Sequence, residues 1–339
     1  MSQPPGASSF APVAPVAHAA AEPQIVIDVP LTPSDNSGVP LGWMLGGLLA
    51  TFVALALTMH RAGLAIDPWS TSNLPFYVFG LSAIAARAWL PGSGLRYARS
   101  IADGAEYYGL FIAMTLMGAI SCYPVVALTH GYSDAKLQAV DAWLGFDWLA
   151  WYRTVAASPL LQRLGTIAYR SIYLSPALLL GYYALAAQRA EAHRFIITFW
   201  ICAIFTLVTF RFMPAVGPFS HLWHAPIPYM PESELWQPDL IPQLRAHRVH
   251  IIDLGQLRGL VSAPSFHAAA ATLYAATAWR VARLRWPLLV VNAAMLLATP
   301  VEGTHYLADI LLGIVVAGVT LAVVHQALRW SGCPRPAGQ

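Results

Sequence analysis

Residues 262–279, SAPSFHAAAATLYAATAW, and residues 302–318, EGTHYLADILLGIVVAG, are two apolar runs that each carry a histidine near their start. A basic turn, RVARLR, and a further apolar run, LLVVNAAMLLATP, connect them. Asp309 follows His305 by four residues, and residues four apart lie on one face of a helix. The stretch therefore predicts apolar helices that hold His267, His305 and Asp309 close to their ends.

The composition of the whole chain is that of a membrane protein. Of its 339 residues, 57% are hydrophobic and 10% are charged, and the mean hydropathy is +0.56. An ordinary soluble domain carries about 25% charged residues. Apolar runs long enough to cross a hydrocarbon core of about 30 Å recur along the chain. We expect an all-α fold, a polytopic membrane helical bundle, and no nucleic-acid partner.

The apolar runs predict eight membrane-spanning helices, at residues 41–60, 74–90, 107–129, 165–187, 195–213, 264–281, 286–299 and 305–327. Residues 139–157 contain three tryptophans, and indole rings favour the membrane interface. We interpret this stretch as one helix lying along the membrane surface, with a further span as the alternative.

The domain organisation follows from these runs. Residues 1–38 are rich in Pro, Ala and Ser and predict a disordered N-terminal tail. Residues 39–106 are expected to form two extra transmembrane helices, and residues 107–328 a catalytic transmembrane domain. The polar insertion 214–262 interrupts that domain outside the membrane, and residues 329–339 form a C-terminal tail.

The short loops indicate the orientation in the membrane. The turns RVARLR and AQRAEAHR are rich in arginine, and short cytoplasmic loops carry an excess of basic residues. This places both termini in the cytoplasm, and His267, His305 and Asp309 together on the opposite side. We expect an integral protein of a bacterial inner membrane with its active site on the periplasmic face.

The three polar residues together predict phosphoryl transfer. Asp309 can accept from one imidazole nitrogen of His305 and leave the other free as a nucleophile. His267 can protonate a departing oxygen. Both histidines stand near predicted helix N-termini, which attract anions. We therefore expect a phosphohistidine intermediate, with His305 attacking phosphorus.

Other interpretations stay open at this point. Each histidine alone could cap a helix, and the intramembrane histidines could form the proton relay of a transporter. HxxxD could also present two metal ligands. The insertion has four histidines, but no cysteine or glutamate obviously completes a shell, and the three cysteines form no CxxC pair. We expect no metal. A Ser–His–Asp hydrolase lacks its G-x-S-x-G signature here.

PSFHAAAA and GTHYLADILLG resemble the second and third motifs of the type 2 phosphatidic acid phosphatase (PAP2) superfamily. They are most similar to the inositol phosphorylceramide synthase-like branch, whose motifs are PS-x-H and HY-x-x-D. The resemblance covers residues 141–324, including DAWLGFDW and RFMPAVGP. It implies a six-helix core, no metal or cofactor, and lipid phosphoesters as substrates. His305 corresponds to the nucleophile, Asp309 to its orienting carboxylate and His267 to the acid.

The resemblance also suggests residues that bind the substrate phosphate, with two departures from the phosphatase branch. The candidates are Arg211, Gly217, Ser265 and Arg258. The phosphatase branch has a Ser-Arg pair before its third-motif histidine, where this chain has Ala298 and Thr299, and no lysine precedes RFMP. Fewer fixed cations favour a phosphodiester monoanion over a terminal phosphate dianion.

The sequence thus predicts an integral-membrane lipid phosphatase or phosphotransferase whose partner is a membrane lipid substrate. The alternative is an inositol phosphorylceramide synthase-like transferase that moves a phospho-head group onto a lipid alcohol. In the insertion, Trp223, Tyr229 and Trp236 are expected to meet the lipid or its head group, and Glu302 has no assigned role. The oligomeric state stays open.

Overall fold

The computed structural model of the chain describes residues 39–330. The predicted N-terminal tail, and the residues after 330 with Cys333, lie outside the described residues. The helices are α1 Leu41–Ala62, α2 Leu74–Trp89, α3 Ala98–Ala127, α4 Asp134–Trp143, α5 Trp148–Ala156, α6 Pro159–Arg170, α7 Leu174–Leu185, α8 Arg189–Phe212, α9 Pro218–Leu222, α10 Gln237–Arg245, α11 Phe266–Ala278, α12 Arg285–Glu302 and α13 Leu307–Trp330. Two short strands, β1 (Ala65–Ile66) and β2 (Ile251–Ile252), pair in parallel.

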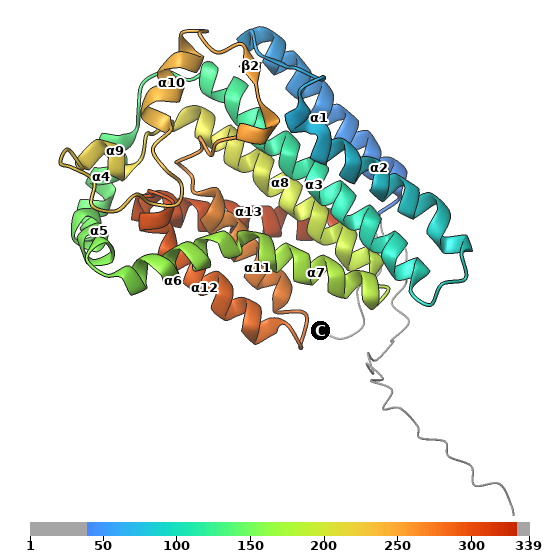
Figure 1. Ribbon diagram of the computed structural model, residues 1–339. Helices are drawn as coiled ribbons and strands as arrows, with labels where there is room; N and C mark the ends of the chain where they lie inside the picture. The colour runs from blue at the N-terminus through green and yellow to red at the C-terminus, as the bar shows by residue number, and fades with distance from the viewer. Residues whose placement is uncertain (1–38, 331–339) are drawn as a thin grey trace, which may run out of the picture. The chain divides into compact units, whose positions relative to one another are not determined.

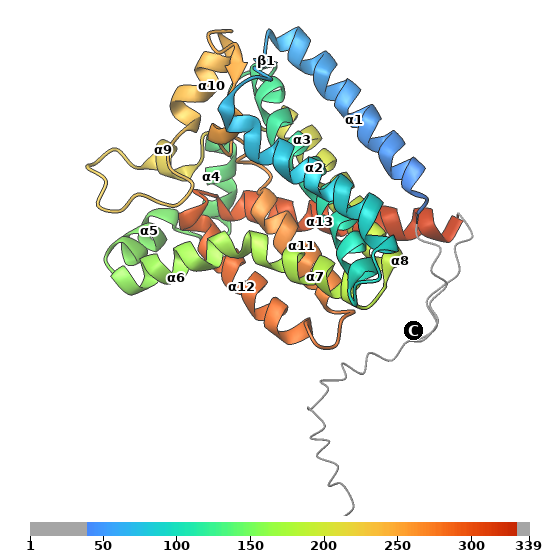
Figure 2. The same cartoon turned by 45° about the vertical axis from the view of Figure 1, so that its right-hand side comes forward.

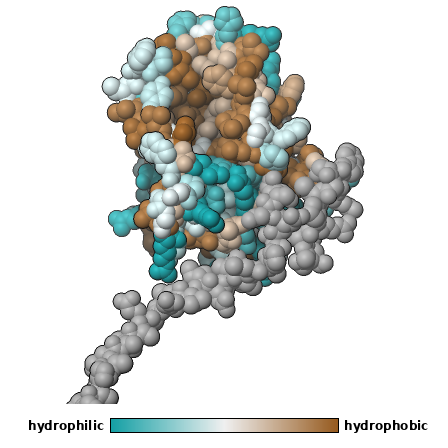
Figure 3. All heavy atoms as spheres, turned by 90° about the vertical axis from the view of Figure 1, so that its right-hand side faces the viewer, coloured by the Kyte–Doolittle hydropathy of each residue, from teal (hydrophilic) through white to brown (hydrophobic). Residues whose placement is uncertain are grey.

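Within residues 39–330, five helical segments are long and apolar enough to cross a membrane, so the chain is an integral membrane protein. They are Leu41–Ala62, Thr71–Gly92, Ala98–Ala127, Arg189–Phe212 and Leu307–Leu328. α1 and α2 bury little of their surface and expose large apolar side chains, such as Leu49 and Leu81. Figure 3 shows hydrophobic residues over much of one face, next to a hydrophilic patch. The prediction of an all-α membrane bundle is confirmed.

Several predicted boundaries were wrong. The third span starts earlier, at Ala98. The stretch 165–187 is divided between α6 and α7 by a 3₁₀ turn, Ser171–Tyr173. Pro176 in the first turn of α7 has no N–H to donate to the carbonyl of residue 172, which favours a break in the helix at this turn. The sixth predicted span is the 13-residue α11, which is about 20 Å long.

The predicted surface helix 139–157 is likewise two helices. α4 has 10 residues and α5 has 9, so each is at most about 15 Å long. Neither can cross a hydrocarbon core of about 30 Å, which excludes the alternative of a further span. Gly145, with φ of 74°, lies in the turn between them, and this left-handed conformation suits glycine.

The core of the bundle joins helices that are far apart in the sequence. α3, α7, α8, α11, α12 and α13 share one cluster of buried apolar side chains, which includes Met114, Leu180, Ile196 and Leu273. Small residues allow α11 and α13 to approach closely: a Cβ added at Gly313 would collide with the backbone oxygen of Ser265. Figures 1 and 2 show the short helices α4, α5 and α9 gathered at the end of the bundle where α12 ends and α13 begins.

A cluster of charged side chains ties the helices together at the other end. The buried carboxylate of Glu106 accepts from Arg87 at 2.7 Å and from Arg189 at 2.7 Å. Nε2 of His193 lies 2.9 Å from the same carboxylate, and its Nδ1 lies 2.9 Å from the carbonyl oxygen of Val39. The cluster joins α2, α3 and α8 to the residue that precedes α1 by two positions.

Candidate active site

His305 and Asp309 form a buried pair at the start of α13. His305 Nδ1 lies 2.9 Å from Asp309 Oδ1. That distance suits a charge-assisted hydrogen bond, although the two atoms do not meet the angle of one. The other carboxylate oxygen of Asp309 accepts from the backbone N–H of Tyr306 at 3.1 Å. Asp309 thus holds the first turn of α13 and lies against the ring of His305, whose Nε2 bonds to none of the described residues.

Two aspartates of α4 hold the backbone around this pair. Asp141 accepts from the N–H groups of Leu307 and Ala308 at 3.0 and 2.7 Å, so it caps the N-terminus of α13 from another helix. Asp134 accepts from the phenol of Tyr306 at 3.1 Å. The start of α13 is therefore held in place by carboxylates from more than 160 residues away.

His267 lies in the first turn of α11 and packs on Tyr169 of α6. The two rings stack with centroids 4.0 Å apart, and the Tyr169 hydroxyl lies 3.1 Å from His267 Nδ1. This contact orients the imidazole and occupies Nδ1, whichever atom carries the proton. Nε2 of His267 makes no bond to another residue of the described range 39–330. It is the nitrogen available for chemistry.

Gly303 brings the two histidines together. A Cβ added there would lie 2.6 Å from Cδ2 of His305 and 2.9 Å from Cε2 of Tyr169. No side chain fits in that position, so the glycine allows the His305 ring to approach the Tyr169–His267 stack. The two histidines and Asp309 therefore form one site between α6, α11 and α13.

Gly217 lies beside this site in the turn after α8. Its φ of 91° is in the region that favours glycine. A Cβ there would lie 2.7 Å from the carbonyl oxygen of Thr304, the residue before His305. The N–H of Gly217 donates to Asp134 at 2.9 Å. Because this N–H is already bonded, Gly217 shapes the turn and does not offer a free donor to a phosphate.

The other candidate phosphate ligands differ in burial and in the partners that their side chains already have. Arg211 is in the last turn of α8, partly buried, and bonds to no other residue between 39 and 330. Ser265 is fully buried, and its hydroxyl caps α11 by accepting from the N–H of Ala268 at 3.3 Å. Arg258 stacks on Trp236 at 3.9 Å and lies 3.8 Å from a carboxylate oxygen of Glu234. Of the two arginines, Arg211 has the guanidinium more available to a ligand.

The aromatic residues of the insertion contact the protein. Trp236 lies under Arg258, and the ring of Trp223 packs against Tyr152 with centroids 4.9 Å apart. Tyr229 donates its hydroxyl hydrogen bond to the buried carboxylate of Glu302, 2.8 Å away. Burial raises the pKa of Tyr229 to about 12, so the phenol keeps its proton at neutral pH.

Glu302 attaches the insertion to the end of α12. Besides the phenol of Tyr229, it accepts from the backbone N–H of Glu232 at 3.1 Å, and its own carbonyl accepts from Ser233 at 2.9 Å. Gly165 makes room for it, since a Cβ there would lie 2.7 Å from the carboxylate. The structure thus gives Glu302 a role in holding residues 229–233 beside the His305 turn.

The described part of the chain has no cluster of three or more His, Cys, Asp or Glu residues suited to a metal. In the insertion, His247 and His250 bond through Nδ1 to the carbonyl oxygens of Ala62 and Gly63. His221 and His224 are exposed. The contacts of His247 and His250 attach the insertion to the end of α1. They add no metal ligand to His305 and Asp309.

Sequence reasoning missed the residues that orient the site. Tyr169, Asp134 and Asp141 all act on partners that are distant in the sequence. Trp148 is a further example, since its indole N–H donates to the carbonyl of Pro300 at 2.8 Å. Asp141 and Trp148 belong to the segment DAWLGFDW, which the family resemblance covers. No comparable signal marks Tyr169, an aromatic residue in an amphipathic helix.

Comparison with known proteins identifies the family of the chain. Residues 135–323, more than half of the chain, match the family model of the PAP2 superfamily, and they include both histidines, Asp309 and Tyr169. The searches of curated proteins and of solved structures gave no match. The match and the helical membrane architecture together identify the chain as a member of the PAP2 superfamily.

Proposed function

We propose that this protein is a lipid phosphatase or phosphotransferase that acts on lipid phosphoesters through a phosphohistidine. PAP2 membership indicates phosphatase- or phosphotransferase-type chemistry. The observation that carries the proposal is the pair of His305 and Asp309, 2.9 Å apart, beside His267 on its tyrosine support. Each histidine keeps one ring nitrogen unbonded among residues 39–330, as a nucleophile and an acid require.

The reaction proceeds in two steps. Nε2 of His305 attacks phosphorus and forms an N–P bond, while the P–O bond to the lipid breaks and His267 gives its proton to the departing oxygen. Asp309 stabilises the positive charge that develops on the His305 ring. Water or a lipid alcohol then attacks the phosphohistidine and passes its proton to His267. The N–P bond breaks, and both histidines return to their starting state.

The charges around the site favour a substrate phosphate with a single negative charge. Arg258 and Arg170 are paired with Glu234 and Glu232, and Arg245 bonds to Thr129 and the carbonyl of Gly131. Among these four arginines, Arg211 alone has no partner within residues 39–330, and one guanidinium balances a monoanion better than a dianion. This supports a second candidate, the transfer of a phospho-head group such as phosphoinositol onto a lipid alcohol.

The orientation in the membrane forms part of the proposal. The arginine-rich turns at residues 187–194 and 280–285 lie at the opposite end of the bundle from the histidines, and basic residues mark the cytoplasmic side. The site then faces the periplasm of a bacterial inner membrane, with both termini in the cytoplasm. The substrate is a lipid of the outer leaflet of that membrane.

A product analysis tests the proposal. Purified protein is incubated in EDTA with phosphatidic acid or phosphatidylinositol, each with and without ceramide, and the products are identified by mass spectrometry. Free phosphate from phosphatidic acid supports the phosphatase, and a new head-group lipid formed only with ceramide supports the transferase. Absence of any product from all four mixtures, with correctly folded protein, would contradict both.

Tyr169→Phe tests the support of His267. The ring stack is retained and only the hydroxyl at 3.1 Å from Nδ1 is lost, so we expect kcat to fall about tenfold, consistent with about 1.4 kcal/mol for one hydrogen bond. KM should change little, and the acid limb of the pH–rate profile should shift because His267 loses a partner. An unchanged pH profile with a lower melting temperature would indicate a packing role instead.

A further inference from the structure

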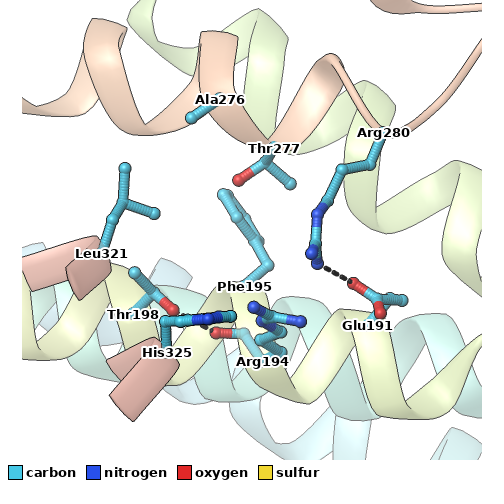
Figure 4. A pocket seen from close by; sticks show the side chains of 9 residues that line it. All are labelled: Glu191, Arg194, Phe195, Thr198, Ala276, Thr277, Arg280, Leu321 and His325. Carbon is cyan, nitrogen blue, oxygen red and sulfur yellow. Dashed lines mark hydrogen bonds and ion pairs between the residues drawn. The ribbon is translucent and has the colours of Figure 1, made fainter. Parts of the chain in front are cut away.

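A cavity with charged groups in its lining lies at the end of the bundle away from His267 and His305. It has a volume of about 250 Å³ and is lined by α8, α11 and α13. Figure 4 shows Arg194 from α8 and Arg280 from the turn after α11 converging on it, with apolar groups such as Phe195 and Leu321 forming other walls. His325 from α13 lies at its edge.

The basic groups of this cavity outnumber its acids. Glu191 is the only carboxylate among the lining residues, and it lies 3.4 Å from Arg280. Arg194 is partly buried, and its guanidinium donates to no residue within 39–330. Its guanidinium is repelled by Arg280 and attracted by Glu191. Two guanidinium groups that face one cavity with a single shared carboxylate leave a positive charge that an anion would neutralise.

The position of the cavity indicates where that anion comes from. His325 follows Asp309 by sixteen positions along α13, which is about 24 Å of helix. This is close to the thickness of a bilayer hydrocarbon core, about 30 Å. If His267 and His305 reach lipid phosphates of one leaflet, the cavity lies near the head-group level of the other leaflet. Trp279, a residue type typical of the interface, is exposed beside Arg280.

We infer that this cavity binds the phosphate group of an anionic ligand between Arg194 and Arg280, separately from the active site. Both guanidinium groups donate to phosphate oxygens, and His325 lies at the rim. A volume of about 250 Å³ accepts a phosphate with a small head group but no acyl chain. The phosphate belongs either to a phospholipid of that leaflet, whose chains remain outside, or to a soluble phosphate compound.

Lipid counting by native mass spectrometry tests the inference. The full chain is used with His305→Ala in all samples, which blocks turnover, and dioctanoyl phosphatidic acid is the probe. Arg194→Gln and Arg280→Gln are each expected to weaken binding at one site about tenfold, as loss of a charge-assisted hydrogen bond does. Arg99→Gln is the matched control, because Arg99 is exposed at the same end outside the cavity.

Three further measurements identify the ligand and exclude a folding defect. Millimolar inorganic phosphate that displaces the lipid from this site shows that phosphate alone suffices, and failure to displace it assigns the site to the lipid. Arg194→Lys keeps the charge and should bind more tightly than Arg194→Gln. The inference is overturned if both glutamine variants bind like Arg99→Gln, or if dioctanoylglycerol, which lacks phosphate, binds equally well. Neither result depends on turnover at His305.

Discussion

His305→Ala should lower product formation by roughly 10⁴-fold or more, because a displaced phosphoryl group then has no nucleophile to accept it. The variant should still fold. Asp309 keeps its hydrogen bond from the backbone N–H of Tyr306, and Asp141 continues to cap α13. We expect the melting temperature of the variant to stay close to that of the unmutated chain, although its activity is lost.

The measurement that isolates this role is covalent labelling. Protein is mixed with lipid carrying ³²P in its phosphate, quenched in base, and analysed on a gel. The unmutated chain should retain a label that is stable to base and lost in acid, as expected of a phosphohistidine, and His305→Ala should retain none. His130→Ala is the matched control, because His130 is exposed and lies outside the site. A labelled His305→Ala protein would assign the nucleophile to another residue.

The part of the candidate site that the sequence predicts is the set of polar residues that interrupt apolar runs. An ionisable group in such a run is costly, so His267, His305 and Asp309 stand out, and the span count places them at the same end of the bundle. The supporting residues do not stand out in this way. Tyr169 approaches His267 from 98 residues away, and Asp134 is recognisable only through its bonds to Tyr306 and Gly217.

The fold shows the same division between local and tertiary information. α1, α2, α8 and α13 were predicted from hydrophobicity alone, since each is long and apolar. α11 is only 13 residues long, because it begins at the Ser265 cap and ends before the basic turn, and it is stable because α8, α12 and α13 cover it. Apolar composition cannot distinguish such a short, covered helix from a span in lipid.

His267→Ala should lower the rate with a lipid substrate by about 10³-fold, within the range of general acid catalysis. The leaving alkoxide of a lipid is a strong base and needs the proton that His267 gives. A nitrophenyl phosphate or phosphodiester has a leaving group that is stable without a proton. In a single turnover of such a substrate, the variant should therefore release nitrophenol less than tenfold more slowly than the unmutated chain.

This dependence on the leaving group separates an acid from a residue that maintains the site. His267 stacks on Tyr169, so its removal also loosens the contact around Gly303, and a purely structural defect would slow both substrates equally. His305→Ala supplies the comparison, because loss of the nucleophile should abolish the first turnover whatever the leaving group. Equal losses with lipid and nitrophenyl substrates in His267→Ala would remove the acid role and leave His305 with Asp309 as the whole of the catalytic set.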